Sequence, residues 1–179
     1  MLLRGYCTID CRILLLNKLL QDGNTLCKKK NMEGAVLRYS YAIRRVPATM
    51  QGPYQNVFLQ LKTHLLLNLS HCKTKMCDYK GAISSATDVL VHDPACCQAY
   101  CARAKAHQAA GDLDKACEDL TEAVKLSPSD RELCSHLIKI KEELRTTGSL
   151  HNSDNKEEEA GNLFSESLGI GLGQGERIR

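Results

Sequence analysis

The chain has 179 residues and a formal charge of +3, with 4% aromatic residues and no tryptophan. This length fits one domain and a tail, and the charge is too small for a typical nucleic-acid-binding surface. The scarcity of aromatic residues and of alternating β-branched runs argues against a β-sandwich, so we predict an all-α protein. Six acids and three bases give residues 151–179 a charge of −3, which leaves +6 on residues 1–150 and favours an acidic partner.

The composition also predicts a compartment. The first twenty residues are interrupted by Arg4, Asp10, Arg12 and Lys18, so we expect no secretory leader. No apolar run approaches the roughly 20 residues needed to cross a bilayer, so no membrane association is predicted. We therefore expect a cytoplasmic protein whose ten cysteines are reduced.

Helical periodicity and breaker residues predict three helix pairs and one last helix. Residues 1–8 are expected to be frayed, 9–147 to form the folded domain, and 148–179 to be a disordered acidic and glycine-rich tail. The predicted helices follow one another in this order: 9–29, 32–45, 52–76, 80–91, 96–110, 113–126 and 132–144.

The stretch from Gln98 to Pro128 resembles a tetratricopeptide repeat (TPR), a 34-residue helix–turn–helix unit with small residues where helices touch. Tyr100 opens its first helix, Gly111-Asp112 forms its turn, and Ala116 lies on one face of its second helix. The resemblance implies a right-handed TPR superhelix of three repeats, closed by a C-terminal capping helix.

Two earlier copies support this interpretation. Ala82 and Pro94 lie 34 residues before Ala116 and Pro128, and the turn residues before Ala82 also match. Pro47 marks a third copy 47 residues before Pro94, so this junction carries 13 extra residues. A longer connection and a longer following helix are predicted there.

Periodicity also predicts which apolar residues face the core. They are Ile13, Leu14, Leu16, Leu19, Leu20 and Leu26 in the first helix, then Val57, Leu61, Leu65, Leu66, Leu69 and Cys72, and finally Leu133, Leu137, Ile140 and Leu144. Gly23 lies inside the first helix, where it costs about 1 kcal/mol relative to alanine. The TPR resemblance implies that a partner helix approaches closely at this glycine.

The first helix of each TPR lines a concave groove. The polar residues predicted to face this groove are Asn24, Lys28, Asn68, His71, Lys75, Gln98, Lys105 and Gln108. One lysine in each repeat would make the groove electropositive, and the asparagines could bind a peptide backbone or a carboxylate. We predict a non-catalytic scaffold or adaptor that binds a peptide or acidic C-terminal segment of a protein partner. The alternative is that these residues form an ordinary solvated face.

A co-chaperone that binds a heat-shock chaperone through a non-standard clamp is the first alternative function. TPR co-chaperones hold the EEVD terminus with two asparagines and three cationic side chains. The two asparagine positions of this clamp hold Asn24 and Asn68, whereas its three cationic positions hold Leu20, Gln98 and Ala102. Arg103 is one residue away from the last position, which turns its side chain about 100° around the helix.

The segment from Arg12 to Leu144 also resembles the TPR portion of TANC-type scaffolds, which combine ankyrin, TPR and coiled-coil regions. The matching strings are Leu19–Leu26, Leu65–Ser70 and Ala99–Ala104. This resemblance implies a cytoplasmic scaffold that brings signalling proteins together. No ankyrin portion is present, so a fragment, a short isoform and a separate small protein all remain open.

A Cys/His metal or redox-sensing protein is the second alternative. The cysteines cluster at Cys7 and Cys11, at Cys72 and Cys77, and at Cys96, Cys97 and Cys101. None of these clusters has the paired C-x₂-C spacing of a zinc site, so no metal is predicted. Cys27, Cys72, Cys101 and Cys117 fall where TPRs take small residues and are expected to pack as small hydrophobic groups. The chain lacks nucleophile and phosphate-loop motifs, so neither enzymatic activity nor a cofactor is expected.

Overall fold

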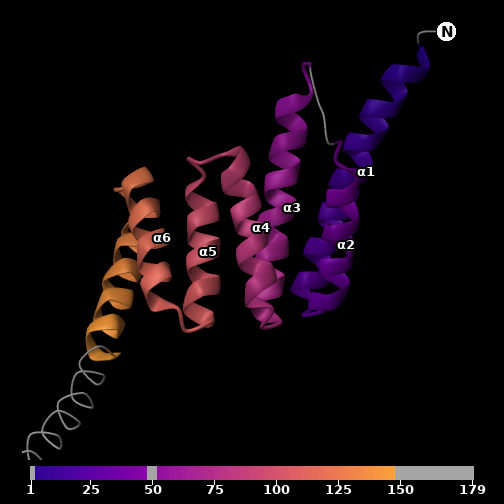
Figure 1. Cartoon of the computed structure of the whole chain (residues 1–179). Helices are drawn as coiled ribbons and strands as arrows, with labels where there is room; N and C mark the ends of the chain where they lie inside the picture. The colour runs from indigo at the N-terminus through magenta and orange to yellow at the C-terminus, as the bar shows by residue number, and fades with distance from the viewer. Residues whose placement is uncertain (1–2, 48–51, 148–179) are drawn as a thin grey trace, which may run out of the picture. The chain divides into compact units, whose positions relative to one another are not determined.

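The computed structural model describes residues 3–47 and 52–147, with side chains from Ile9 onward. All regular secondary structure in these ranges is helical, which confirms the all-α prediction (Figure 1). The first six helices are α1 (Leu3–Lys28), α2 (Met32–Arg45), α3 (Gln55–Lys75), α4 (Tyr79–His92), α5 (Cys97–Ala109) and α6 (Leu113–Leu126). A seventh helix covers residues 131–147.

The chain divides into two compact units, Met1–Ile140 and Lys141–Arg179. In the first unit, each helix packs against its neighbours in sequence, and α3 also contacts both α1 and α5 (Figure 1). The first helices of the three pairs therefore form one continuous face. In the second unit only residues 141–147 are described, and they are helical. The tail predicted at 148–179 lies outside the described residues.

The three helix pairs are closed by turns of one design. The side chain of the capping residue accepts a hydrogen bond from the backbone N–H three residues later, at 2.9, 3.0 and 3.4 Å for Asn31, Asp78 and Asp112. The backbone N–H of each capping residue donates to the carbonyl five residues earlier. The residue before the cap has a positive φ, which is 61° at Lys30, 61° at Cys77 and 84° at Gly111. This geometry fixes where each second helix starts relative to the end of the first.

Most helix bounds agree with the prediction, and the main difference is at the start of α1. The prediction for α2 and α6 matches the structure at both ends, since each has a cap residue before it and a proline after it. α1 begins at Leu3, upstream of the predicted start at Ile9, and no proline interrupts the helix there. The predicted fraying of residues 1–8 stays a prediction. α3 has 21 residues against 13 in α5, which confirms a longer helix after the first junction.

The largest apolar cluster joins α1, α2 and α3 around Leu16, Tyr39 and Leu65. Two predicted core residues, Leu14 and Val57, are exposed instead. Leu14 is 68% exposed, because it lies two positions before Leu16, which places it about 200° around the helix. Val57 is 38% exposed, and its neighbour Phe58 is buried in its place. The N-terminal half of α3 therefore joins this cluster through a position that was not predicted.

Two further predictions concern Gly23 and the last helix. A Cβ atom added at Gly23 would lie 2.3 Å from the Cε1 atom of Tyr39, which confirms the close approach of α2. Ile140 is fully buried, and Leu133 and Leu137 are half-buried. Leu144 belongs to the second unit. No helix among the described residues has both the length and the apolar character needed to cross a membrane.

Candidate functional site

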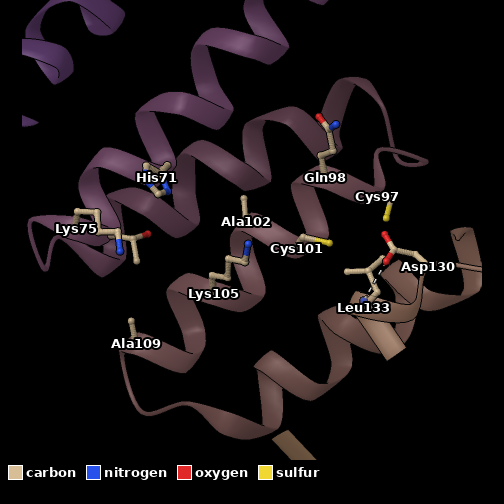
Figure 2. A pocket seen from close by; sticks show the side chains of 11 residues that line it. His71, Lys75, Cys97, Gln98, Cys101, Ala102, Lys105, Ala109, Asp130 and Leu133 are labelled. Carbon is tan, nitrogen blue, oxygen red and sulfur yellow. Dashed lines mark hydrogen bonds between the residues drawn. The ribbon is translucent and has the colours of Figure 1, made fainter. Parts of the chain in front are cut away.

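A cleft of about 640 Å³ opens between the end of α3, the exposed side of α5 and the start of the seventh helix. Figure 2 shows its walls, with His71 and Lys75 on one helix and Ala102 and Lys105 on the next. The lining residues are His71, Thr74, Lys75, Cys97, Gln98, Cys101, Ala102, Lys105, Ala109, Asp130 and Leu133. The cleft therefore lies on the face formed by the first helices of the repeats, where the groove was predicted.

Four of the eight predicted groove residues line this cleft, namely His71, Lys75, Gln98 and Lys105. Lys75 and Lys105 are exposed, and neither forms an ion pair with another described residue. Loss of water on the packed side of the His71 ring lowers its pKa, and the charges of Lys75 and Lys105 lower it further. Both lysines therefore place positive charge near His71, whose ring is neutral at neutral pH.

The only acid lining the cleft is already engaged. One carboxylate oxygen of Asp130 accepts hydrogen bonds from the backbone N–H groups of Glu132 and Leu133, at 3.0 and 3.2 Å. Asp130 thus caps the seventh helix, which is why the local sequence signalled a helix start and not a groove residue. The uncompensated charge of the cleft is positive.

The floor of the cleft is apolar and was not predicted as part of the site. Cys101, Ala102, Ala109 and Leu133 supply small or aliphatic surface. Burial, together with the neighbouring Cys97 thiol, raises the pKa of Cys101 to about 12, so its thiol stays protonated. Such a thiol contributes apolar surface and is a poor nucleophile or metal ligand.

The other four predicted groove residues lie outside the cleft. The amide oxygen of Asn24 accepts hydrogen bonds from the Tyr39 hydroxyl at 2.7 Å and from the Asn68 side-chain amide at 2.9 Å. The asparagines therefore bind each other, and their role in binding a peptide backbone or a carboxylate stays a prediction. Gln108 lies within 3.0 Å of the ring of His136 on the seventh helix, and Lys28 is exposed in the last turn of α1.

The positions expected for a chaperone clamp also differ in their surroundings. Gln98 and Ala102 line the cleft as uncharged residues, whereas Leu20 packs against the apolar cluster of α1, α2 and α3. Arg103 points away from the cleft, as its register predicts, and its guanidinium pairs with the Asp119 carboxylate at 2.7 Å. Lys75 and Lys105 supply the positive charge that the clamp positions lack.

The alternative of a metal site has little support in the described part of the chain. No group of three or more His, Cys, Asp or Glu side chains there is arranged to hold a metal ion. Burial and the adjacent Cys27 thiol raise the pKa of Cys72 to about 12. The Cys97 thiol donates to the carbonyl oxygen of Ala123 at 3.5 Å. Cys72 is fully buried and packs as a small apolar group, as its helix position predicts. Cys97 was not among the cysteines predicted to pack in this way.

Comparison with known proteins identifies the repeat. Residues 97–130 match the family model of the tetratricopeptide repeat. The chain is 29% identical over 144 residues to the peptidyl-prolyl cis-trans isomerase FKBP42 of Arabidopsis thaliana, covering 78% of the chain and 40% of that protein. It is 31% identical over 126 residues to the aryl-hydrocarbon-interacting protein-like 1 of Mus musculus, covering 68% and 38%. The chain thus spans about two fifths of the length of these relatives.

Solved structures agree with the fold. The C-terminal TPR-containing domain of a Plasmodium falciparum FK506-binding protein superposes with a TM-score of 0.66 at 23% identity, covering 77% of this chain and 93% of that domain. The first TPR of Spaghetti (RPAP3), bound to the HSP90 peptide SRMEEVD, gives 0.61 at 20%, covering 74% and 97%. The myosin chaperone UNC-45 of C. elegans, in complex with an Hsp90 peptide, gives 0.61 at 26%, covering 76% and 15%. The predicted TPR superhelix is confirmed, whereas the TANC-type resemblance stays a prediction.

Proposed function

We propose that this tetratricopeptide repeat protein is a non-catalytic adaptor that holds an acidic peptide segment of a partner protein in the cleft between α3, α5 and the seventh helix. The observation that carries the proposal is that Lys75 and Lys105, which form no ion pair with the described residues, lie beside an apolar floor. The lysine ammonium groups would bind carboxylates, while Cys101, Ala102 and Leu133 would cover an aliphatic side chain. The pocket favours a short segment, because its volume is about 640 Å³.

The C-terminal segment of a heat-shock chaperone is the best-supported ligand. Similar TPR domains have been solved with HSP90 and HSP70 peptides that end in EEVD. Such a segment presents carboxylates and an aliphatic side chain, which match the two surfaces of the cleft. A cytoplasmic scaffold of the TANC type, with a different acidic partner, is the second candidate and rests on the sequence strings described above.

A labelled peptide that ends in EEVD is expected to bind the chain with a dissociation constant in the low micromolar range. Reversing one cleft charge with Lys105→Glu should weaken binding by about tenfold or more, equivalent to about 1.4 kcal/mol or more, because attraction becomes repulsion at the carboxylates. Fluorescence anisotropy measures this change. Lys80→Glu, an exposed substitution on α4 outside the cleft, is the matched control.

The same titration tests the proposal itself. A C-terminally amidated peptide should bind more weakly, since it lacks one carboxylate. Absence of binding at about 100 µM would mean an interaction weaker than about −5.5 kcal/mol and would eliminate the chaperone terminus as the ligand. Equal losses in Lys105→Glu and Lys80→Glu would indicate attraction to the net charge of the protein and would contradict a specific cleft.

Peptide affinity is expected to increase as the pH falls from 7.5 to 5.5. In the free cleft, burial and the two lysines keep the pKa of His71 below its usual value, so its ring is neutral at pH 7.5. A bound carboxylate favours the protonated ring, so binding takes up a proton, and acidification strengthens it by about threefold. Anisotropy titrations across this range measure the slope. His71→Gln should abolish it, and an unchanged slope in that variant would assign the effect to another group.

A further inference from the structure

A second cleft of about 580 Å³ lies between α1 and the end of α2. Its lining residues are Cys11, Arg12, Leu15, Arg44, Arg45, Val46 and Pro47, and it shares none of them with the cleft described above. The residues of the two helices come together because α1 and α2 are antiparallel, so the first half of α1 lies beside the end of α2. Pro47 stops α2 at this point and leaves Val46 in an extended conformation.

Three arginines line this cleft, namely Arg12, Arg44 and Arg45, and no acid is among its lining residues. Arg12 and Arg44 are exposed, and neither makes a hydrogen bond or ion pair with the described residues. Arg45 lies over the ring of Tyr41, with 4.5 Å from its guanidinium carbon to the ring centroid, and donates a hydrogen bond to the Tyr41 hydroxyl. Tyr41 therefore orients Arg45 while leaving other N–H groups free.

The helix end does not cancel this charge. The last carbonyl groups of α2 amount to about half a negative charge, against three positive side chains. Beside the arginines, Leu15 is 38% exposed, and Val46 and Pro47 are half-buried. Among the described residues, the cleft thus combines three arginines that no lining acid neutralises with an aliphatic wall.

We propose that this arginine cleft binds a phosphorylated serine or threonine flanked by apolar residues in a peptide segment of a partner protein. A phosphoryl group has three acceptor oxygens and about two negative charges, so it can engage two guanidinium groups at once. A single carboxylate has two oxygens, which one guanidinium satisfies. The planar guanidinium group of arginine matches the geometry of phosphate oxygens better than the ammonium group of lysine does. The two clefts therefore differ in the anion that they favour.

The geometry argues against two other anionic partners. A nucleic acid needs a long basic track, often with aromatic stacking, whereas this cleft is short and Tyr41 is covered on one face by Arg45. An anionic membrane is flat and would contact a broad basic surface, whereas these arginines border a concave site. A peptide side chain with its neighbours fits a volume of this size.

The test uses the full chain labelled with ¹⁵N and the peptide acetyl-Gly-Leu-pSer-Leu-Gly-amide, compared with its unphosphorylated and Ser→Glu forms. We expect the phosphopeptide to shift the Nε–H signals of Arg12 and Arg44 and the amide signals of Leu15 and Val46. The glutamate form should bind at least fivefold more weakly, and the serine form should cause no shift. The combined Arg12→Gln and Arg44→Gln variant should bind at least tenfold more weakly. Arg131→Gln, which removes an exposed arginine elsewhere, should bind unchanged.

Several results would overturn the proposal. They are equal shifts with the serine or glutamate peptide, shifts confined to Lys75 and Lys105, or no shift at about 5 mM phosphopeptide. Equal half-saturation by inorganic phosphate would reduce the cleft to a free-phosphate site. Arginine-dependent binding to phosphatidylserine vesicles, without peptide binding, would assign the surface to a membrane. Circular dichroism of the variants excludes unfolding as the cause of any loss.

Discussion

Replacing Arg103 with alanine is expected to lower the free energy of unfolding by about 3 kcal/mol. The Arg103 guanidinium donates to both carboxylate oxygens of Asp119, at distances of 2.7 to 3.2 Å, and to the Thr87 hydroxyl at 3.2 Å. The Asp119 side chain is only 7% exposed. Loss of Arg103 leaves this carboxylate buried without its main partner, and breaking such pairs typically costs about 3–5 kcal/mol.

Urea unfolding followed by circular dichroism measures this loss. The double variant Arg103→Met and Asp119→Leu should be more stable than Arg103→Ala alone, because removing both charges removes the desolvated carboxylate as well. Lys125→Ala breaks an exposed pair with Glu122 and should leave the unfolding midpoint nearly unchanged. A double variant that is less stable than the single one would show that the pair stabilises the fold by more than charge compensation.

Replacing Gly23 with valine is expected to destabilise the chain by about 3 kcal/mol, although valine forms helices better than glycine. The new Cβ atom would lie 2.3 Å from Cε1 of Tyr39 and 2.8 Å from its Cδ1 and Cζ atoms. The Tyr39 ring cannot move aside easily, since it is 1% exposed and its hydroxyl donates to Asn24. The clash must therefore separate α1 from α2.

A double-mutant cycle distinguishes this clash from a local effect on α1. In a Tyr39→Leu background the ring is absent, so Gly23→Val should cost less than about 1 kcal/mol. Gln21→Val places the same side chain at an exposed position of α1 and should cost only a few tenths of a kcal/mol. An equal cost of Gly23→Val in both backgrounds would mean that Tyr39 is not the obstacle. Thermal or urea unfolding supplies all four values.

Local signals explain how much of the fold was predictable. Residue types that cap or break helices mark both ends of α2 and α6. Asn31 and Asp112 cap their starts, and Pro47 and Pro128 follow their ends, so the prediction placed both helices correctly. The start of α1 has no such signal, and the helix begins at Leu3, before the predicted Ile9. Phe58 and Val57 are adjacent and both apolar, so only packing in the folded cluster determines which one turns inward.

The groove residues that could be predicted are those that the 34-residue spacing of the repeats places at equivalent positions. His71 and Lys105 are 34 residues apart and occupy equivalent places on α3 and α5, and both line the cleft. Asn24 and Asn68 share that face, but a contact between residues 44 positions apart in sequence joins their side chains. Asp130 enters the site only because the chain folds back after α6. Such contacts depend on tertiary structure and leave no trace in local sequence.

The uniform turns also fix the spacing between each capping residue and the side chains near the end of the first helix of the pair. Asn24, His71 and Lys105 each stand seven residues before the cap that follows them, Asn31, Asp78 and Asp112. Residues inserted upstream of a first helix, as between α2 and α3, therefore change its length without rotating the side chains near its end. A single residue inserted between Lys75 and Asp78 would disrupt that count. Length can vary between repeats while these three residues keep their alignment.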